Sequence, residues 1–159
     1  MKIETIKKPA FSVIGKEGST KDGAGFIQSL WSEASAHFGE IARLVKTDET
    51  GAPAGVWGAM TDFSHSYKPW ENNFSEGKYL AGAEVFDDAI APEGWTKWTI
   101  PGFVYLKAEN EENLFPKMLA YLSENGFTLS GAVHDFTDVK AGKSYMLFPI
   151  QKIAPEQRQ

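Results

Sequence analysis

Acidic and aromatic side chains are the residues of this chain whose types could support specific chemistry. Three carboxylates, Glu84, Asp62 and Asp135, lie within or beside segments rich in apolar residues. Six aromatic residues from neighbouring segments could surround such a carboxylate: Trp57, Tyr79, Trp95, Trp98, Phe103 and Tyr105. Aromatic ring faces attract positive charge, and a buried carboxylate neutralises that charge away from water. These residues therefore favour a lipophilic cation as ligand.

The same residues also have a purely structural interpretation, which the sequence leaves open. Aromatic residues at alternate strand positions are usually part of a core, and Asp62 and Asp135 are suited to capping turns at strand ends. Glu84 is surrounded by small and apolar residues in Ala81-Gly82-Ala83-Glu84-Val85, so its carboxylate points either to solvent or into a cavity.

Catalytic interpretations have fewer residues behind them. The chain has no G-x-S-x-G motif, and the adjacent pair His134-Asp135 is a weak signal for a metal. A glutamate with a tyrosine, such as Glu84 with Tyr79 or Tyr105, could act as general base and acid in a hydrolysis. We assign no catalytic residue, no metal ligand and no cofactor, and the hydrolase stays open as an alternative.

The composition excludes several classes of protein. The 159 residues are 42% hydrophobic and 13% aromatic, which is typical of a folded domain, and the net charge of −5 argues against nucleic acid as a direct partner. The absence of cysteine excludes disulfides and thiolate chemistry. No signal peptide and no run of about 18 apolar residues is present. We expect a single soluble domain over residues 1–159, located in the cytoplasm and without a membrane segment.

Three short motifs occur twice along the chain in the same order. Gly58-Ala59-Met60-Thr61-Asp62-Phe63 returns as Gly131-Ala132-Val133-His134-Asp135-Phe136. Upstream, Lys8-Pro9-Ala10-Phe11 matches Ile100-Pro101-Gly102-Phe103, and downstream Gly77-Lys78-Tyr79 matches Gly142-Lys143-Ser144-Tyr145. The repeat predicts a duplication, with one copy over about residues 1–86 and the other over about 94–153.

Hydrophobic periodicity predicts a strand, a helix and two strands in each copy. The first copy is expected as a strand over 2–15 interrupted at Pro9, a flexible loop over 15–25, a helix over 26–45, a strand over 56–63, a loop over 65–77 and a strand over 78–86. The second is expected as a strand over 95–106, a helix from Asn110 or Asn113 to about Glu124, and strands over 129–136 and 144–150.

These elements predict an α+β fold with two main helices. Each copy would form an antiparallel sheet covered by one helix, and the two copies would pack about a pseudo-twofold axis. Two sheets that meet along such a seam would leave a central groove, which is a preferred place for a ligand.

The sequence also resembles a known family. The pattern VWGAMTDF, YKPWENNF, GKYLAGAEV, PEGWTKWTIPGFVYLKAE, GAVHDFT and GKSYMLFPI is similar to the GyrI-like small-molecule-binding family, over about residues 2–152. This family includes the effector-binding domains of AraC-type and multidrug-sensing bacterial transcription regulators. The resemblance implies a duplicated strand-helix-strand-strand fold with a ligand groove between the copies, and binding of hydrophobic, often cationic, compounds.

The chain departs from the family pattern at one informative place. Many relatives carry a glutamate followed by a tyrosine in the penultimate strand, where this chain reads Val133-His134-Asp135-Phe136-Thr137. The acid is therefore shortened to Asp135 and the tyrosine is missing. The regulators also carry a helix-turn-helix segment, which this chain lacks, so we expect a stand-alone module.

The sequence thus predicts a small-molecule-binding module for a lipophilic or cationic compound. The expected charge partners are Glu84 and Asp135, and the expected walls are Trp57, Tyr79, Trp95, Trp98, Phe103 and Tyr105. Glu84→Gln should then weaken cation binding by roughly 2 kcal/mol. The alternatives are a hydrolase of reactive small molecules that uses a Glu/Tyr pair, and a module with a protein partner, either a regulator or DNA gyrase.

Overall fold

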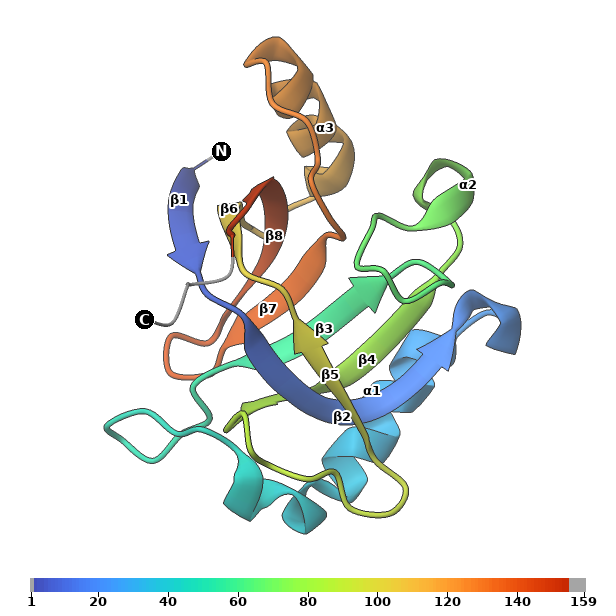
Figure 1. Cartoon of the computed structure of the whole chain (residues 1–159), viewed down its shortest axis with the longest axis vertical. Helices are drawn as coiled ribbons and strands as arrows, with labels where there is room; N and C mark the ends of the chain where they lie inside the picture. The colour runs from blue at the N-terminus through green and yellow to red at the C-terminus, as the bar shows by residue number, and fades with distance from the viewer. Residues whose placement is uncertain (1, 155–159) are drawn as a thin grey trace.

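Residues 2–154, which the computed structural model describes, form one eight-stranded antiparallel sheet with two main helices (Figure 1). The strands are β1 (Ile3–Lys8), β2 (Phe11–Ser19), β3 (Val56–Thr61), β4 (Lys78–Val85), β5 (Thr96–Ile100), β6 (Phe103–Glu109), β7 (His134–Asp138) and β8 (Lys143–Lys152). The helices are α1 (Phe26–Ala36), the single turn α2 (Glu71–Phe74) and α3 (Leu114–Glu124). The predicted α+β class is confirmed. Within the described residues, no helix combines the length and the apolar character needed to cross a membrane.

The sheet is continuous, whereas the sequence predicted two sheets that meet at a seam. Its strand order is β1-β6-β8-β7-β3-β4-β2-β5. The two central strands pair directly, with Val56 opposite Thr137 and Gly58 opposite Asp135. This pairing satisfies backbone groups that would otherwise remain as two exposed sheet edges, which is the physical reason for one sheet instead of two.

The strand order is symmetric about the β3–β7 pair. On one side it runs β7-β8-β6, and on the other it runs β3-β4-β2, so the corresponding strands of the two halves occupy corresponding places. The first strand of each half pairs with a strand of the other half: β1 pairs with β6, and β5 pairs with β2. The topology is compatible with the predicted duplication, which stays a prediction.

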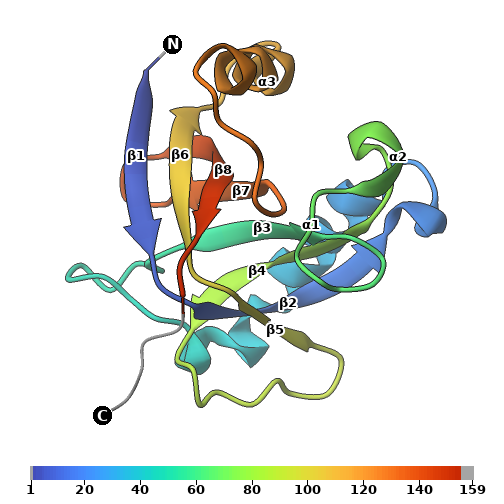
Figure 2. The same cartoon turned by 45° about the horizontal axis from the view of Figure 1, so that its top comes forward.

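The sheet curls strongly, so that β2 and β5 cross over β3 and β4 (Figures 1 and 2). We call the concave side the inner face. Its buried cluster is aromatic and aliphatic and contains Phe11, Val13, Trp57, Ala59, Leu80, Trp98, Ile100, Phe103, Tyr105 and Leu147. Because both ends of the sheet contribute to this cluster, the inner face is filled by side chains of the sheet itself.

The opposite side, which we call the outer face, carries both main helices. Helix α1 packs on Ile14, Ala83 and Val85, and helix α3 packs on Leu106 and Phe148. The predicted apolar stripes are the surfaces that the helices bury. In Figure 1, α1 lies behind the sheet and α3 lies at the top.

Several predicted boundaries were wrong, for local reasons. The helix expected over 26–45 ends at Ala36 and continues as two 3₁₀ turns, Phe38–Glu40 and Ala42–Leu44. The strand expected over 95–106 is two strands, because Pro101 cannot donate a backbone hydrogen bond. The interruption predicted at Pro9 is confirmed, since β1 ends at Lys8 and β2 begins at Phe11.

Two other segments also differ from their predictions. The glycine-rich stretch expected as a loop over 15–25 continues as β2 to Ser19, because Gly15 lies against β4: a Cβ on Gly15 would be 2.3 Å from the carbonyl oxygen of Ala81. The strand expected over 129–136 begins only at His134.

Candidate ligand-binding site

Asp135 lies on the outer face at the centre of the sheet. Its neighbours across β3 and β8 are Gly58 and Met146. The Tyr79 hydroxyl donates a hydrogen bond of 3.1 Å to Oδ2 of Asp135, and the Trp31 indole Nε1–H donates one of 3.1 Å to the Tyr79 hydroxyl. Among residues 2–154, no lysine, arginine or histidine nitrogen lies within 4 Å of the Asp135 carboxylate. Asp135 is therefore a half-buried acid without a cationic partner.

Gly58 makes this arrangement possible. A Cβ at Gly58 would lie 1.8 Å from the Tyr79 hydroxyl oxygen and 3.1 Å from Cβ of Asp135. The Tyr79 side chain thus crosses the place where any other residue would carry its side chain. Edge-to-face contacts with Phe26 and Trp31, at centroid distances of 6.5 and 6.4 Å, hold the ring from the side of α1.

Burial sets the protonation of this pair. It raises the pKa of the Asp135 carboxyl above its ordinary value, and the hydrogen bond from Tyr79 lowers that pKa by a smaller amount. Burial and the neighbouring Asp135 also raise the pKa of Tyr79, so the phenol keeps its proton and acts as a donor. A cation placed beside Asp135 would favour its charged form, which the protein itself stabilises only weakly.

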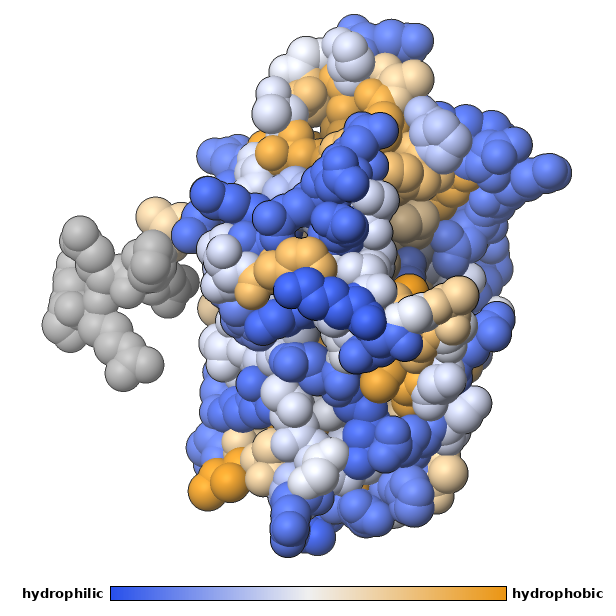
Figure 3. All heavy atoms as spheres, turned by 90° about the vertical axis from the view of Figure 1, so that its right-hand side faces the viewer, coloured by the Kyte–Doolittle hydropathy of each residue, from blue (hydrophilic) through white to orange (hydrophobic). Residues whose placement is uncertain are grey.

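An apolar hollow of about 150 Å³ is lined in part by Met146, the neighbour of Asp135 on β8. We call it the Met60 hollow, and it is lined by Met60, Pro69, Trp70, Phe74, Phe115, Val133 and Met146. Met60 follows Gly58 by two residues on β3, and Val133 precedes Asp135 by two, so both side chains share the outer face with the carboxylate. Apolar surface gathers below α3 in the view from this side (Figure 3).

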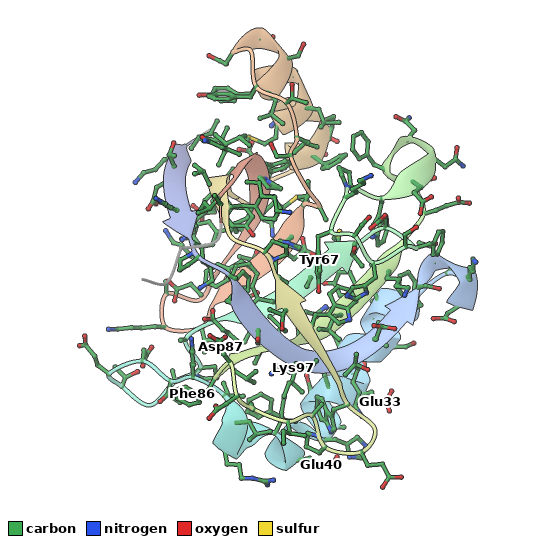
Figure 4. All side chains as sticks on the ribbon, in the orientation of Figure 1. Glu33, Glu40, Tyr67, Phe86, Asp87 and Lys97 are labelled. Atoms are coloured by element: carbon green, nitrogen blue, oxygen red, sulfur yellow. The ribbon has the colours of Figure 1, made fainter. Side chains whose placement is uncertain are left out.

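The loop 65–77 and α3 supply four of the seven lining residues of the Met60 hollow: Pro69, Trp70, Phe74 and Phe115. Trp70 donates its indole N–H to the carbonyl oxygen of Lys78 at 2.9 Å, and the ring of Phe74 packs edge-to-face on that of Phe115 at 5.3 Å. The loop is attached to the other half of the chain, because the Tyr67 carbonyl oxygen accepts a hydrogen bond of 2.9 Å from the Ala132 N–H. Figure 4 labels Tyr67 at the base of this loop.

The same loop has an unusual backbone. Five of its residues other than glycine have φ between 51° and 65°, in the left-handed region: His65, Tyr67, Asn72, Asn73 and Phe74. Asparagine tolerates this region, whereas a bulky residue there costs about 1 to 2 kcal/mol. The loop is therefore held in a strained form by its contacts, next to the hollow that it encloses.

A second hollow, of about 270 Å³, lies on the other side of Asp135 beneath α1. We call it the Trp31 hollow, and it is lined by Trp31, Ala34, Ser35, Phe38, Ile41, Val56, Gly82, Ala83 and Trp95. At its far end Trp95 donates its indole N–H to Glu40 at 2.9 Å, and the Lys16 ammonium lies 4.2 Å from the Trp95 ring centroid. Glu40 is labelled in Figure 4.

Glu84 lies on the inner face, away from Asp135. Its side chain is buried and has two lysine partners, Lys8 at 2.9 Å and Lys46 at 3.5 Å. The Lys8 ammonium also lies 4.5 Å from the ring centroid of Phe11 and 5.7 Å from that of Trp57. The combination of aromatic rings and a buried carboxylate predicted for a ligand therefore surrounds a cation of the protein itself.

Four of the predicted wall residues belong to the inner core. Trp57, Trp98, Phe103 and Tyr105 are each at most 2% exposed. Trp98 donates its indole N–H to Glu17 at 2.6 Å, whereas the Trp57 indole N–H and the Tyr105 hydroxyl have no hydrogen-bond partner among residues 2–154. The structure thus brings Asp135 and Tyr79 together on the outer face, with Trp95 further along it, and places these four residues on the inner face with Glu84.

Asp62 and His134 form hydrogen bonds that hold the backbone in place. The Asp62 carboxylate accepts hydrogen bonds from the Ser66 N–H at 2.8 Å and the Thr61 hydroxyl at 2.9 Å, so it shapes the start of the loop. His134 is fully buried, and its Nδ1 accepts a hydrogen bond of 3.0 Å from the Met60 N–H. Burial lowers the pKa of His134 to about 3, so its imidazole is neutral and links β7 to β3 beside Asp135.

Sequence reasoning missed most residues of the two hollows, namely Trp31, Met60, Trp70, Phe74, Phe115 and Met146. A signal existed for some of them. Trp70 and Phe74 lie in a long aromatic loop, a type of segment that is often involved in binding. Met60 shares strand parity with Gly58, so its side of the sheet could be predicted. Phe115 and Met146 gave no comparable signal, because their place depends on how the halves pack.

The fold is also found in solved structures. No family model matches the sequence, and neither does any curated protein. SAV2435, solved with tetraphenylphosphonium bound, is similar with a TM-score of 0.59 at 13% identity, over 96% of this chain and 94% of that one. The EcmrR C-terminal domain is similar with a TM-score of 0.60 at 14% identity, over 96% and 98% of the two chains. An integron cassette protein of Vibrio cholerae gives 0.54 at 16% identity, over 95% of both chains. The chain therefore shares its fold with these structures, in agreement with the resemblance to the GyrI-like family that its sequence indicated.

Proposed function

We propose that this protein binds a lipophilic organic cation on the outer face of its sheet, with Asp135 as the charge partner. The observation that carries this proposal is the surroundings of that carboxylate. Asp135 has one hydrogen bond, from Tyr79, no cationic neighbour within 4 Å in the described part of the chain, and an apolar hollow beside it. Glu84, by contrast, has two lysines.

The lining of the Met60 hollow suits such a ligand. Trp70, Phe74 and Phe115 offer ring faces and edges, and Met60 and Met146 are flexible and polarisable. A cation with apolar groups would bury those groups in the hollow and place its charge against Asp135. The ligand in SAV2435 has this chemistry, and at 13% identity it supports the class of ligand and not the identity of the contacting residues.

Binding without chemistry is the simplest role for these groups. A hydrolase would pair Glu84 with Tyr79 or with Tyr105. Tyr79 bonds to Asp135 on the outer face, away from Glu84. Tyr105 shares the inner face with Glu84, but its hydroxyl is buried without a hydrogen-bond partner among residues 2–154, and the Glu84 carboxylate bonds to two lysines. We therefore propose a module that senses or sequesters its ligand, like the effector-binding domains of regulators.

The direct test compares two variants that each remove one negative charge. Isothermal titration calorimetry would measure the binding of tetraphenylphosphonium and of the neutral triphenylphosphine oxide to wild type, Asp135→Asn and Glu84→Gln. We expect Asp135→Asn to weaken binding of the cation about 30-fold, which corresponds to about 2 kcal/mol, and to leave the neutral compound within twofold.

Glu84→Gln serves as the matched control. It changes the net charge by the same amount, so a general electrostatic effect would appear equally in both variants. An unchanged cation affinity in Asp135→Asn would refute the proposal. A loss confined to Glu84→Gln would move the site to the inner face, to the other charge partner that the sequence predicted.

A further inference from the structure

We infer that the preferred ligand has two apolar arms with a positive charge between them, one arm in the Met60 hollow and the other in the Trp31 hollow. This inference rests on the proposed function, because it assigns the charge to Asp135. It goes further by specifying the shape and the length of the compound.

The size of the hollows is the first argument. The Met60 hollow measures about 150 Å³ and the Trp31 hollow about 270 Å³. Sites for drug-sized ligands start at roughly 300 Å³. Each of the two hollows is smaller than this and the two together are larger, so a ligand of that size bound at Asp135 would extend into both.

The positions of the hollows along β3 are the second argument. Val56 lines the Trp31 hollow and Met60 lines the Met60 hollow. Gly58 lies midway between them, directly opposite Asp135. With a rise of about 3.3 Å per residue, the four steps from Val56 to Met60 span about 13 Å. The carboxylate thus lies near the middle of the line that joins the hollows.

Hydrogen bonds supply a third argument, because they connect the lining of the Trp31 hollow to the Asp135 carboxylate. Trp31 lines its hollow and also donates to Tyr79, which donates to Asp135. This chain of side chains runs from the lining of the Trp31 hollow to the Asp135 carboxylate. A ligand that lies across it would present its central charge to Asp135 and one apolar group to each side.

The two linings predict different arms. The Met60 hollow has two methionines and three aromatic residues, which adapt to a bulky group. The Trp31 hollow has a floor of Gly82 and Ala83 between the rings of Trp31 and Trp95, a shape that suits a flat ring. The small side chains of residues 81–83 leave space for such a ring.

The test uses a pair of compounds that differ by one arm. Bis(3-phenylpropyl)dimethylammonium carries two phenyl groups about a single charge, and (3-phenylpropyl)trimethylammonium carries one. We expect calorimetry to give at least tenfold tighter binding for the two-armed compound. Ser35 lies at an exposed position of α1, and Ser35→Leu should narrow the Trp31 hollow. Ser35→Leu and Phe115→Leu, the latter in the Met60 hollow, should each reduce the affinity ratio of the two compounds to less than threefold.

The outcomes separate this inference from the proposed function. If both compounds bind equally well and both lose affinity in Asp135→Asn, the cation site stands and the two-armed ligand is refuted. If neither depends on Asp135, the proposed function fails. If Ser35→Leu leaves the advantage of the second arm unchanged, the Trp31 hollow is not the second subsite and the inference is overturned.

Discussion

Gly58→Ala is the substitution that tests the centre of the site most directly. A methyl group at this position would lie 1.8 Å from the hydroxyl oxygen of Tyr79 and 2.5 Å from its Cζ. The backbone has little freedom to withdraw, because β3 is paired on both sides, with β4 and with β7. The Tyr79 ring must therefore move, and its bonds to Asp135 and Trp31 must break.

The expected cost follows from these two hydrogen bonds. A bond to a carboxylate contributes about 1.5 to 3 kcal/mol and a neutral bond about 1 kcal/mol. Alanine offsets part of the loss by about 0.4 to 1 kcal/mol, because it restricts the unfolded chain more than glycine does. We expect a net destabilisation of about 2 to 3 kcal/mol, or a fall in Tm of roughly 5 to 10 °C for a domain of this size.

Urea denaturation followed by circular dichroism measures this free energy, with Gly39→Ala as the matched control. A Cβ at Gly39 meets nothing within 4 Å, so that variant should stay within about 0.5 kcal/mol of wild type. Tyr79→Leu removes the ring tip, and Gly58→Ala should then cost less than 1 kcal/mol in that background. An equal cost of Gly58→Ala with and without the Tyr79 ring would refute this reasoning.

Three further predictions concern protonation and the loop. Burial raises the pKa of Asp135, so the affinity for a permanently charged cation should fall on acidification with a midpoint above about pH 3.9, the ordinary aspartate value. This pH dependence should be absent in Asp135→Asn. A midpoint below about pH 3.9 would contradict the assignment of Asp135 as the charge partner. The pKa of about 3 for buried His134 means that only the unfolded chain gains this proton as the pH falls below about 6.5. His134 should therefore lower the free energy of unfolding by about 1.4 kcal/mol per pH unit from about pH 6.5 down to 3, and have no effect above that range. Urea titrations of His134→Asn at several pH values should lack this contribution to the pH dependence. Parallel plots of unfolding free energy against pH for the variant and the wild type would disprove it. In Gly77→Ala the new methyl group would lie 2.2 Å from the Trp70 ring, so tryptophan fluorescence should shift and tetraphenylphosphonium affinity should fall at least fivefold, whereas an unchanged spectrum would show that Trp70 does not pack there.

The alternation of side chains between the two faces of each strand could be predicted from the sequence, and it also sorts the predicted site residues between the faces. Strand period places Trp57 and Ala59 on one side of β3 and Gly58 and Met60 on the other, and the structure has this division. The same parity argument separates Tyr79 from Glu84, which are five residues apart on β4. Strand period alone therefore places them on opposite faces, and the predicted wall residues could have been sorted in the same way.

The sequence by itself determined the local elements, because the periods of helix and strand and the effects of proline act between near neighbours. The presence of α1 and α3, the end of α3 at Glu124 and the break at Pro9 are of this kind, whereas the break at Pro101 was not predicted. The resemblance to the GyrI-like family added the overall arrangement of the elements.

Only the tertiary structure decided which carboxylate has cationic partners within the chain. Glu84 acquires Lys8 and Lys46 from distant parts of the chain, while Asp135 acquires Gly58 and Tyr79 and no cation within 4 Å in the described residues. Such partners depend on the pairing of β3 with β7 and on the curl of the sheet. These are long-range contacts, whose free energy depends on the whole packed core, and no local pattern of residues encodes them.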